Sequence, residues 1–444
     1  MRNRNFLGFV LALMLIVPTC ARAADRPNIL LIMADDVGSD AIGCYGGQSY
    51  PTPHIDKLAA GGLKFRHAYS MPVCHPTRMC LMTGRYPFRF GAAGSKWGDF
   101  PDEAEELAIG NRMQQAGYRT AVAGKWQLCL MKNDVDHPRR TGFDEWCLFG
   151  WHEGGRYHDP LIYQNGVRRT DTTGQYGPDI YVDFLIDFMQ RSHHADEPFF
   201  AYYPMALCHD VTDDLNGELV AFATDDRWMA YGEMMASMDD MVGRLITALE
   251  QMGIRDDTLI LFTTDNGTAA ASYSRLDASG KMTKEKVFSI RNGTVVPGGK
   301  GKTDDTGTRV PLIANWPGRI EPGTETDILV DFTDFLPTLA EVANLPPDDV
   351  PRDGVSFAPT LLGTSGQEQK RDWIYIEHRG QRCVRSHHAK LYSDGRFFDL
   401  TTDPLESSPV SESELTGETR RAYAQLNAAL NDLQKPLPQD RQSL

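Results

Sequence analysis

The sequence contains no apolar segment long enough to cross a membrane. Its longest apolar run, residues 6–17, has 12 residues, whereas a spanning helix needs about 20. Arg2 and Arg4 precede this run, and the small-residue stretch 21–23 follows it. A basic start, a short apolar run and small residues at the end are typical of a signal peptide. We therefore predict that residues 1–23 are a signal peptide and that the protein is exported, to a periplasm or outside the cell.

This N-terminus has two other interpretations. A membrane anchor is disfavoured by the shortness of the apolar run. A lipid anchor on Cys20 is disfavoured because residues 17–19, Val-Pro-Thr, lack the small side chains that such processing favours. The mature chain is expected to begin at Ala24 and to contain no integral membrane segment.

The sequence also lacks the features of several other protein classes. It has 45 basic and 60 acidic residues, for a net charge of −15, so we expect no binding to nucleic acid. Its eight cysteines form no CxxC pair and no zinc-like spacing, which excludes a disulfide scaffold and a zinc finger. An exported protein can still form disulfides, and the spacing leaves their pairing open. There is no internal repeat, and 41% apolar residues with 40 glycines fit an ordinary globular protein.

Two unbroken apolar runs indicate buried parallel strands. They cover residues 28–34 and 258–264, and each is short and uniformly apolar, as a strand covered on both faces is. Between them, residues 228–252 carry apolar side chains at helical spacing. The alternation of strands and helices predicts an α/β fold with a large, mostly parallel sheet flanked by helices.

A second, smaller domain is predicted at the C-terminus. A helix-like stretch at 335–343 is followed by proline, glycine and polar residues over 346–369. We place the boundary near 365, which gives a catalytic domain of residues 24–365 and a small α+β domain of residues 366–444. The second domain is expected to contain short strands and one long helix, at 373–376, 383–385, 390–392 and 420–433.

Oxygen-bearing side chains follow both predicted central strands. Asp35 and Asp36 come directly after the first strand, and Asp265 and Asn266 directly after the second. Ligands gather at the carboxyl edge of such sheets, and carboxylate and amide oxygens suit Ca²⁺ or Mg²⁺. Each pair taken alone is better explained as a turn that ends a strand. Their occurrence after two such strands favours a metal site.

The segment from residue 74 to residue 85 carries the most specific pattern. It reads Cys-His-Pro-Thr-Arg and ends in Thr83, Gly84 and Arg85. This pattern resembles the signature of the type I sulfatases, C-x-P-x-R followed by T-G. In that family the cysteine is oxidised to formylglycine by a maturation enzyme, and the hydrated aldehyde supplies the nucleophile. A buried structural cysteine before a proline turn is the alternative interpretation.

The resemblance extends over nearly the whole chain and implies an alkaline-phosphatase-like fold. Matches to arylsulfatase-like sequences occur in order along the chain, at 27–36, 52–59, 124–126, 198–200, His209, 238–239, 264–267, 299–301, 309–311, 334–338, 398–400 and 403–404.

The resemblance also implies a role for each site residue. Hydrated formylglycine 74 would attack sulfur, Arg78 would hold the nucleophile, and His209 would protonate the leaving alcohol and contact the substrate. Lys125 and Lys300 would bind sulfate oxygens, with Lys302 as the alternative if the loop is shifted by two residues. The implied metal ligands are Asp35, Asp36, Cys74, Asp265 and Asn266, and the implied ion is Ca²⁺, with Mg²⁺ as the alternative.

Two departures from the family pattern stand near these residues. Gln127 occupies a position where the family usually has histidine, and glutamine cannot accept a proton. Because Gln127 cannot act as the base, the elimination step would use another base, or metal-bound water or hydroxide. The second departure is at residues 304–306, where Asp-Asp-Thr replaces an aromatic residue, a glutamate and a glycine.

The substrate is the least specified feature. Residues 149–163 include Trp151, His152, Arg156 and His158, which suit stacking on sugars and contact with anionic groups, although a packed loop explains them equally well. We assign Arg156 and His158 to substrate binding and expect a sulfated carbohydrate or polysaccharide. The alternatives are a phosphomonoester or phosphonate hydrolase of the same superfamily and a non-catalytic glycan-binding homologue.

Overall fold

The structure is a computed structural model of the 444-residue chain. It describes residues 26–95, 100–150, 154–210, 213–214, 219–220, 230–276, 282–347, 349–364 and 370–437. The predicted signal peptide, the domain boundary near 365, Trp151, His152 and the start of the predicted helix at 228 lie outside these residues.

The core of the fold is a ten-stranded mixed sheet. Its strand order is β16-β2-β15-β10-β1-β7-β3-β4-β5-β6. The neighbours β10-β1-β7-β3-β4 all run parallel, whereas β15 is antiparallel to both β10 and β2. The strands are β1 (Asn28–Ala34), β2 (Leu63–Tyr69), β3 (Arg119–Lys125), β4 (Glu145–Phe149), β5 (Ile162–Gln164), β6 (Val167–Arg168), β7 (Phe199–Pro204), β10 (Thr258–Thr264), β15 (Arg309–Asn315) and β16 (Thr324–Asp331).

The central strand β1 is buried on both faces, which explains its uniformly apolar sequence. Ile29, Leu31 and Met33 belong to one hydrophobic core, and Leu30 and Ile32 belong to the other. Because side chains alternate along a strand, the two sets face opposite layers of helices. The two strands predicted from apolar runs have the predicted bounds, 28–34 and 258–264.

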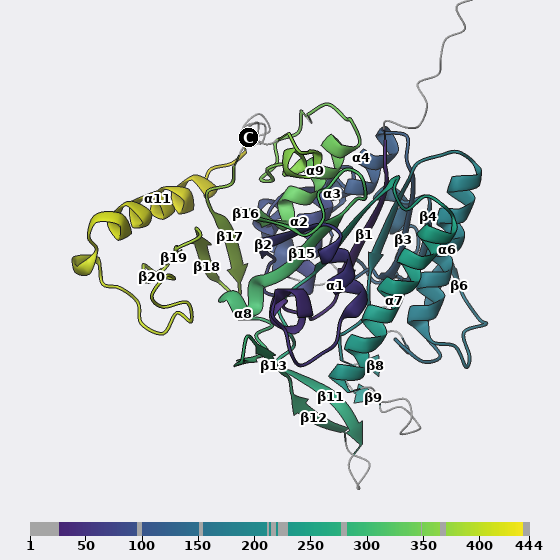
Figure 1. The fold of residues 1–444 in the computed structure, drawn as a ribbon, viewed down its shortest axis with the longest axis horizontal. Helices are drawn as coiled ribbons and strands as arrows, with labels where there is room; N and C mark the ends of the chain where they lie inside the picture. The colour runs from purple at the N-terminus through teal and green to yellow at the C-terminus, as the bar shows by residue number, and fades with distance from the viewer. Residues whose placement is uncertain are drawn as a thin grey trace, which may run out of the picture.

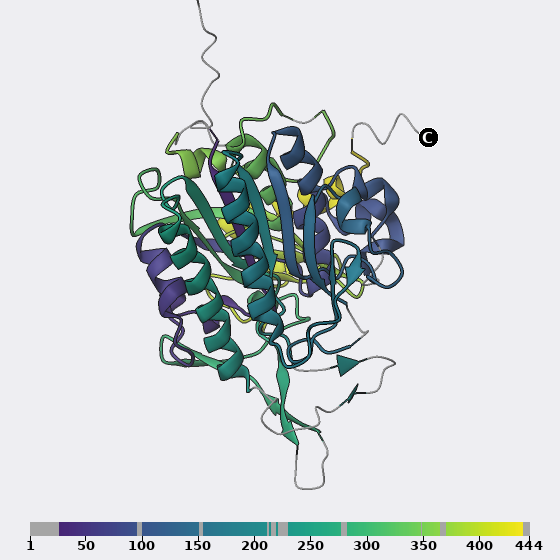
Figure 2. The same cartoon turned by 90° about the vertical axis from the view of Figure 1, so that its right-hand side faces the viewer.

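Helices cover both faces of the sheet. Two long helices, α6 (Gly177–His194) and α7 (Tyr231–Gln251), lie side by side across one face (Figure 2). The opposite core takes in side chains of α2 and α9. The remaining helices are α1 (Pro53–Ala60), α2 (Cys74–Thr83), α3 (Asp102–Glu105), α4 (Ile109–Gln115), α5 (His137–Arg140), α8 (Asp305–Thr308), α9 (Phe335–Val342), α10 (Ala358–Leu362) and α11 (Gly417–Leu433). The helix predicted at 228–252 corresponds to α7.

A smaller antiparallel sheet forms the C-terminal domain, beside the β16 edge of the large sheet (Figure 1). Its strands are β17 (Ile374–His378), β18 (Gln381–Arg385), β19 (Ala389–Tyr392) and β20 (Phe397–Asp399), and α11 packs against it. Tyr69 of β2 and Leu329 of β16 share a small hydrophobic core with this sheet. The predicted fold class is confirmed, and β20 is a strand that the sequence patterns did not predict.

Three short hairpins complete the described elements. They pair β8 (Asp213–Asp214) with β9 (Leu219–Val220), β11 (Ala271–Leu276) with β12 (Met282–Lys286), and β13 (Phe288–Arg291) with β14 (Thr294–Pro297). Among the described residues, no helix is both long and apolar enough to span a bilayer.

Candidate active site

Two parallel strands bring four oxygen-bearing side chains to one edge of the sheet. Ala34 of β1 and Thr264 of β10 are register partners, so the residues that follow them meet just beyond the sheet. The Asp265 amide donates to the Ala34 carbonyl at 3.0 Å. The Asp36 amide donates to Oδ1 of Asp265 at 3.2 Å. The predicted proximity of Asp35, Asp36, Asp265 and Asn266 therefore follows from strand register.

Cys74 is the first residue of α2, and its side chain points into this acidic cluster. Its Sγ lies 3.4 Å from Oδ1 of Asp35 and 3.9 Å from Oδ1 of Asp36. Burial and the negative charge of Asp265 raise the pKa of the thiol above its usual range, although Lys125 and Lys300 act in the opposite direction. Cys74 is buried, but it is buried against carboxylates rather than in the apolar core.

The donor set fits a hard divalent cation. Ligand atoms of Asp35, Asp36, Cys74 and Asp265 all lie within 4.8 Å of one another. Oδ1 of Asn266 is buried and has no hydrogen-bond partner among the described residues, while its Nδ2 donates to Oδ1 of Asp36 at 2.8 Å. Three buried carboxylates are costly without positive charge nearby. An oxygen-binding cation would satisfy both the carboxylates and the orphaned amide oxygen.

Two lysines place positive charge beside the carboxylates. Lys125, at the end of β3, is fully buried, and its Nζ lies 2.5 Å from Asp35 and 3.3 Å from the Cys74 sulfur. Nζ of Lys300 lies 2.7 Å from Asp36, and its side chain is 24% exposed. Burial alone would lower the pKa of Lys300, but the negative charge of Asp36 outweighs it and raises that pKa. Lys302, the alternative contact, has an exposed side chain, so the geometry favours Lys300.

Arg78 lies under the cluster and connects three segments of the chain. It is one turn after Cys74 on α2, and its side chain is buried. Its guanidinium donates to Oδ2 of Asp265 at 2.7 Å and to the Lys125 carbonyl at 2.8 Å. The arginine therefore fixes α2, the end of β3 and the segment after β10 relative to one another.

His209 is paired with a carboxylate that the sequence analysis did not single out. Its Nδ1 lies 2.9 Å from Oδ1 of Asp210. Burial lowers the pKa of His209 well below its usual value, and the charges of Arg156 and Lys300 lower it further. A carboxylate on one ring nitrogen of histidine orients the ring and fixes which nitrogen carries the proton. An acidic residue directly after the candidate histidine was the signal that could have identified Asp210.

The residues assigned to substrate binding divide into two groups. Arg156 lies near His209, because its Nη1 donates to the Asp210 carbonyl at 3.4 Å. The ring of His158 instead packs on Tyr176, with 5.2 Å between ring centroids.

Gln127 follows β3 in a left-handed conformation with φ +55°. Its carbonyl contacts Nδ1 of His75 at 2.9 Å, and its buried Oε1 has no partner among the described residues.

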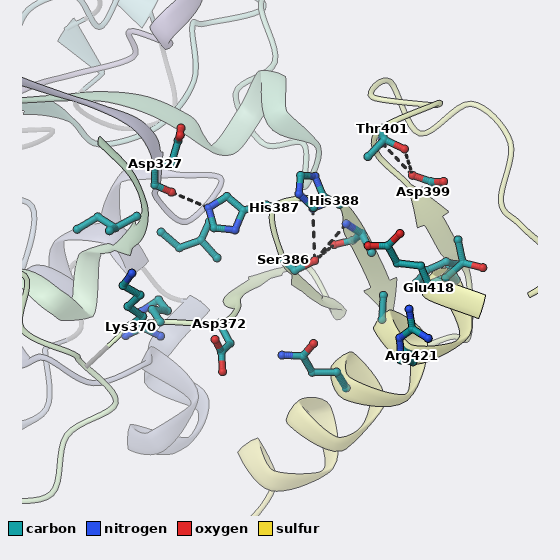
Figure 3. A pocket seen from close by; sticks show the side chains of 18 of the residues that line it. Asp327, Lys370, Asp372, Ser386, His387, His388, Asp399, Thr401, Glu418 and Arg421 are labelled. Carbon is teal, nitrogen blue, oxygen red and sulfur yellow. Dashed lines mark hydrogen bonds between the residues drawn. The ribbon is translucent and has the colours of Figure 1, made fainter. Parts of the chain in front are cut away.

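A pocket lined by other residues lies in the C-terminal part of the fold. It has a volume of about 1040 Å³, and its lining includes Asp327, Lys370, His387, Glu418 and Arg421 (Figure 3). None of the site residues named above lines it. Both acidic and basic side chains line it, so charge alone favours no class of ligand.

Carboxylates, two lysines and an arginine at the carboxyl edge of a mixed sheet are the arrangement of an α/β enzyme that acts on an anion. The family model described as Sulfatase matches residues 27–345, and the model described as "N-sulphoglucosamine sulphohydrolase, C-terminal" matches residues 302–436. The chain belongs to the sulfatase family and is a sulfatase enzyme, as the resemblance predicted.

Individual relatives agree with this assignment. The chain is 32% identical to human arylsulfatase A over 90% of this chain and 81% of that protein. It is 31% identical to the N-acetylgalactosamine-6-sulfatase of Canis lupus familiaris over 82% of this chain and 70% of that protein. Among solved structures, it is similar to Ps i-CgsB, with a TM-score of 0.71 and 25% identity over 93% of this chain and 94% of that chain.

Proposed function

We propose that this protein hydrolyses sulfate monoesters of a carbohydrate, using a formylglycine made from Cys74 as its nucleophile. The observation that carries the proposal is the position of the Cys74 sulfur, 3.4 Å from Asp35 and 3.3 Å from Nζ of Lys125. A nucleophile at this point lies beside both an anion-binding positive charge and cation-binding carboxylates. Conversion needs a maturation enzyme that oxidises Cβ and removes the sulfur.

The reaction is proposed to run in two steps. One hydroxyl of the hydrated aldehyde attacks sulfur, and the bond from sulfur to the alcohol oxygen breaks. Burial and the charges of Arg156 and Lys300 lower the pKa of His209, and the bound sulfate is proposed to offset those charges, so that the ring takes up a proton. His209 then donates this proton to the alcohol oxygen, and the alcohol leaves neutral. The second hydroxyl of the hydrate then loses its proton, the carbonyl re-forms, and sulfate departs. Addition of water to the aldehyde restores the hydrate for the next turnover. A covalent intermediate divides one difficult displacement into two easier ones.

Residues of the chain are proposed to hold the sulfate group in place for this attack. Lys125 and Lys300 neutralise its oxygens as point charges, and Arg78 fixes the helix that carries the nucleophile. Asp35, Asp36, Asp265 and Asn266 would hold Ca²⁺, or Mg²⁺ in its place. When bound, such a cation supplies positive charge that polarises the sulfate group and favours ionisation of the attacking hydroxyl.

A carbohydrate substrate is supported by the relatives and by the rim of the site. One relative that covers most of this chain is named for a sulfated amino sugar, N-acetylgalactosamine-6-sulfate. Arg156, near His209, supplies positive charge for a second anionic group, and His158 is proposed to contact the sugar. The predicted signal peptide supports export and action on extracellular or periplasmic material.

The test combines mass spectrometry with kinetics. The protein is co-expressed with a formylglycine-generating enzyme, and conversion is measured on the peptide that contains residue 74. Turnover is then compared between an aryl sulfate and the matched aryl phosphate, with Cys74→Ala as the control that cannot be converted. Faster phosphate turnover would overturn the proposal in favour of a phosphate hydrolase. Full conversion with glycan binding but no turnover would favour a non-catalytic homologue.

A further inference from the structure

The loop that carries Lys300 is held on one side by the catalytic domain. The Thr268 carbonyl accepts hydrogen bonds from the amides of both Gly299 and Lys300, at 2.9 and 3.0 Å. The Gly301 amide donates to the Pro72 carbonyl at 2.8 Å, two residues before Cys74. These bonds tie the loop to the segments that carry Asp265 and the nucleophile.

On its other side, the loop is held by a buried lysine of the C-terminal sheet. Nζ of Lys390, on β19, donates to the Thr303 carbonyl at 2.5 Å and lies 2.6 Å from Oε1 of Glu406. Tyr392, two residues further on the same strand, donates its hydroxyl to Oε2 of Glu406 at 2.5 Å. The Thr303 hydroxyl lies 3.1 Å from the Tyr392 hydroxyl. Both the backbone and the side chain of Thr303 are therefore engaged by the C-terminal domain.

The side chains of Lys390 and Glu406 are both buried at this contact. The Lys390 side chain has no exposed surface, and that of Glu406 is 7% exposed. Burial alone would lower the pKa of Lys390, but the negative charge of Glu406 keeps it raised and the ammonium charged. A buried charge must have its hydrogen bonds satisfied, and here one of those bonds goes to a loop of the other domain. Displacing the loop would therefore leave a buried donor unpaired.

We propose that Lys390 is a positioning residue for the sulfatase site: with Glu406 and Tyr392 it clamps the loop at Thr303 and thereby sets the place of Lys300. Through Lys390, the C-terminal domain then influences catalysis without contacting the substrate. Two residues, Gly301 and Lys302, lie between Lys300 and Thr303. Gly301 has φ +85°, and Nε2 of His378, on β17, lies 3.9 Å from the position that a Cβ of Gly301 would take. The clamp rests on the proposed function of Lys300.

A purely structural role for Lys390 is the competing explanation. In that case, removing the Lys390 side chain would lower stability and would affect turnover independently of Lys300. A double-mutant cycle separates the two, because residues that act through one another give non-additive effects. The variants are Lys390→Met, Lys300→Met and their combination, each converted at residue 74. Lys435→Met is the matched control, since Lys435 forms an exposed pair with Asp432 at the end of α11 in the same domain.

The expected result is a fall of about 10- to 100-fold in kcat/KM for an aryl sulfate in Lys390→Met, because small displacements of binding groups cost this much. In the Lys300→Met background, the same substitution should change kcat/KM by less than about twofold. Lys435→Met should behave as wild type. An equal loss in both backgrounds, or no loss in the wild-type background, would overturn the clamp. If Lys390→Met does not fold, Tyr392→Phe makes the same test with a smaller change.

A second measurement is independent of sulfatase activity. Amide hydrogen exchange is followed in peptides covering residues 299–304 and, as a reference, β10. Lys390→Met should speed exchange in 299–304 and leave β10 unchanged. If Lys390→Met and the wild type differ in this way but the wild type has no sulfatase turnover, the proposed function fails while the clamp stands. Unchanged exchange in 299–304 would refute the clamp even in an active enzyme.

Discussion

Arg78 and Asp265 form a fully buried ion pair, with 2.7 Å between Nη2 and Oδ2. The same guanidinium donates to the carbonyl of Lys125. The pair therefore joins the helix that begins with Cys74 to the end of β10, which carries a proposed metal ligand. It also joins this helix to the end of β3, which carries a proposed sulfate contact.

Arg78→Lys should lower turnover more than stability alone explains. Lysine keeps the charge but cannot reproduce the two directed hydrogen bonds, so we expect kcat/KM to fall about 100-fold through misplacement of the nucleophile. The matched control is Arg89→Lys, because Arg89 likewise bonds a buried aspartate, Asp353, and a backbone carbonyl, that of Lys435. Thermal unfolding and kinetics are measured on both. Similar losses of turnover would show that Arg78 has no specific role at the site.

Divalent cations should stabilise the folded protein through the carboxylate cluster. At a concentration 100 times the dissociation constant, binding to the folded state adds about 2.7 kcal/mol. Chelation should therefore lower Tm and abolish turnover, and Ca²⁺ or Mg²⁺ should restore both. Asp265→Asn is expected to remove most of the Tm shift on adding the ion. An undiminished shift in that variant would place the ion elsewhere.

His209→Gln should be most harmful for substrates with poor leaving groups. General acid catalysis contributes about 10²–10⁴-fold, and an alkyl or sugar sulfate needs that proton more than a nitrophenyl sulfate does. The measurement is the ratio of kcat/KM values for the two substrate types in wild type and variant. Asp210→Asn should shift the same ratio by a smaller factor, because the histidine remains but loses the partner of Nδ1. An unchanged ratio in His209→Gln would remove His209 as the proton donor.

The sequence predicted those parts of the fold whose physics is local. A strand covered on both faces is uniformly apolar, so 28–34 and 258–264 stood out, and the residues that follow them had to meet at one edge. The strand at 397–399 was not predicted because its three residues, Phe-Phe-Asp, carry too short a pattern to separate a strand from a loop.

The sequence analysis named the residues of the candidate site but not the tertiary contacts that hold them in place. Lys125 and Lys300 lie beside Asp35 and Asp36, and their roles as sulfate contacts stay predictions. The pairing of His209 with Asp210 and the grip of Lys390 on Thr303 depend on tertiary contacts. No spacing rule connects residues 303 and 390, because their proximity arises from how the C-terminal sheet docks on the large one.

Arg371→Met should be strongly destabilising. Its side chain is 5% exposed and lies 3.3 Å from Asp331, and its Nε donates to Asp334 at 2.9 Å. Removing one partner of a buried ion pair costs about 3–5 kcal/mol, here at the junction before β17. Urea unfolding measures the loss. Lys435→Met, at an exposed position, should change stability by less than about 0.5 kcal/mol. A loss of similar size in both variants would contradict a special role for Arg371.

Buried His137 should make the protein less stable as pH falls from about 6.5 towards 4. Burial lowers the pKa of His137 to about 4, against the opposing charges of Glu105 and Asp134, and its Nδ1 accepts a hydrogen bond from the Trp126 indole at 3.0 Å. The unfolded chain takes up this proton near its ordinary pKa of about 6.5, well before the folded protein does, so acid favours unfolding.

The magnitude follows from this difference in proton uptake. Between those two pH values, His137 should remove up to about 1.4 kcal/mol of unfolding free energy per pH unit. His137→Asn keeps a hydrogen-bond acceptor for Trp126 but cannot be protonated in this range, so its stability should fall less steeply with acid. Urea unfolding of both proteins at several pH values between 7 and 4.5 measures the difference in slope. Parallel pH profiles would show that His137 does not contribute to acid sensitivity.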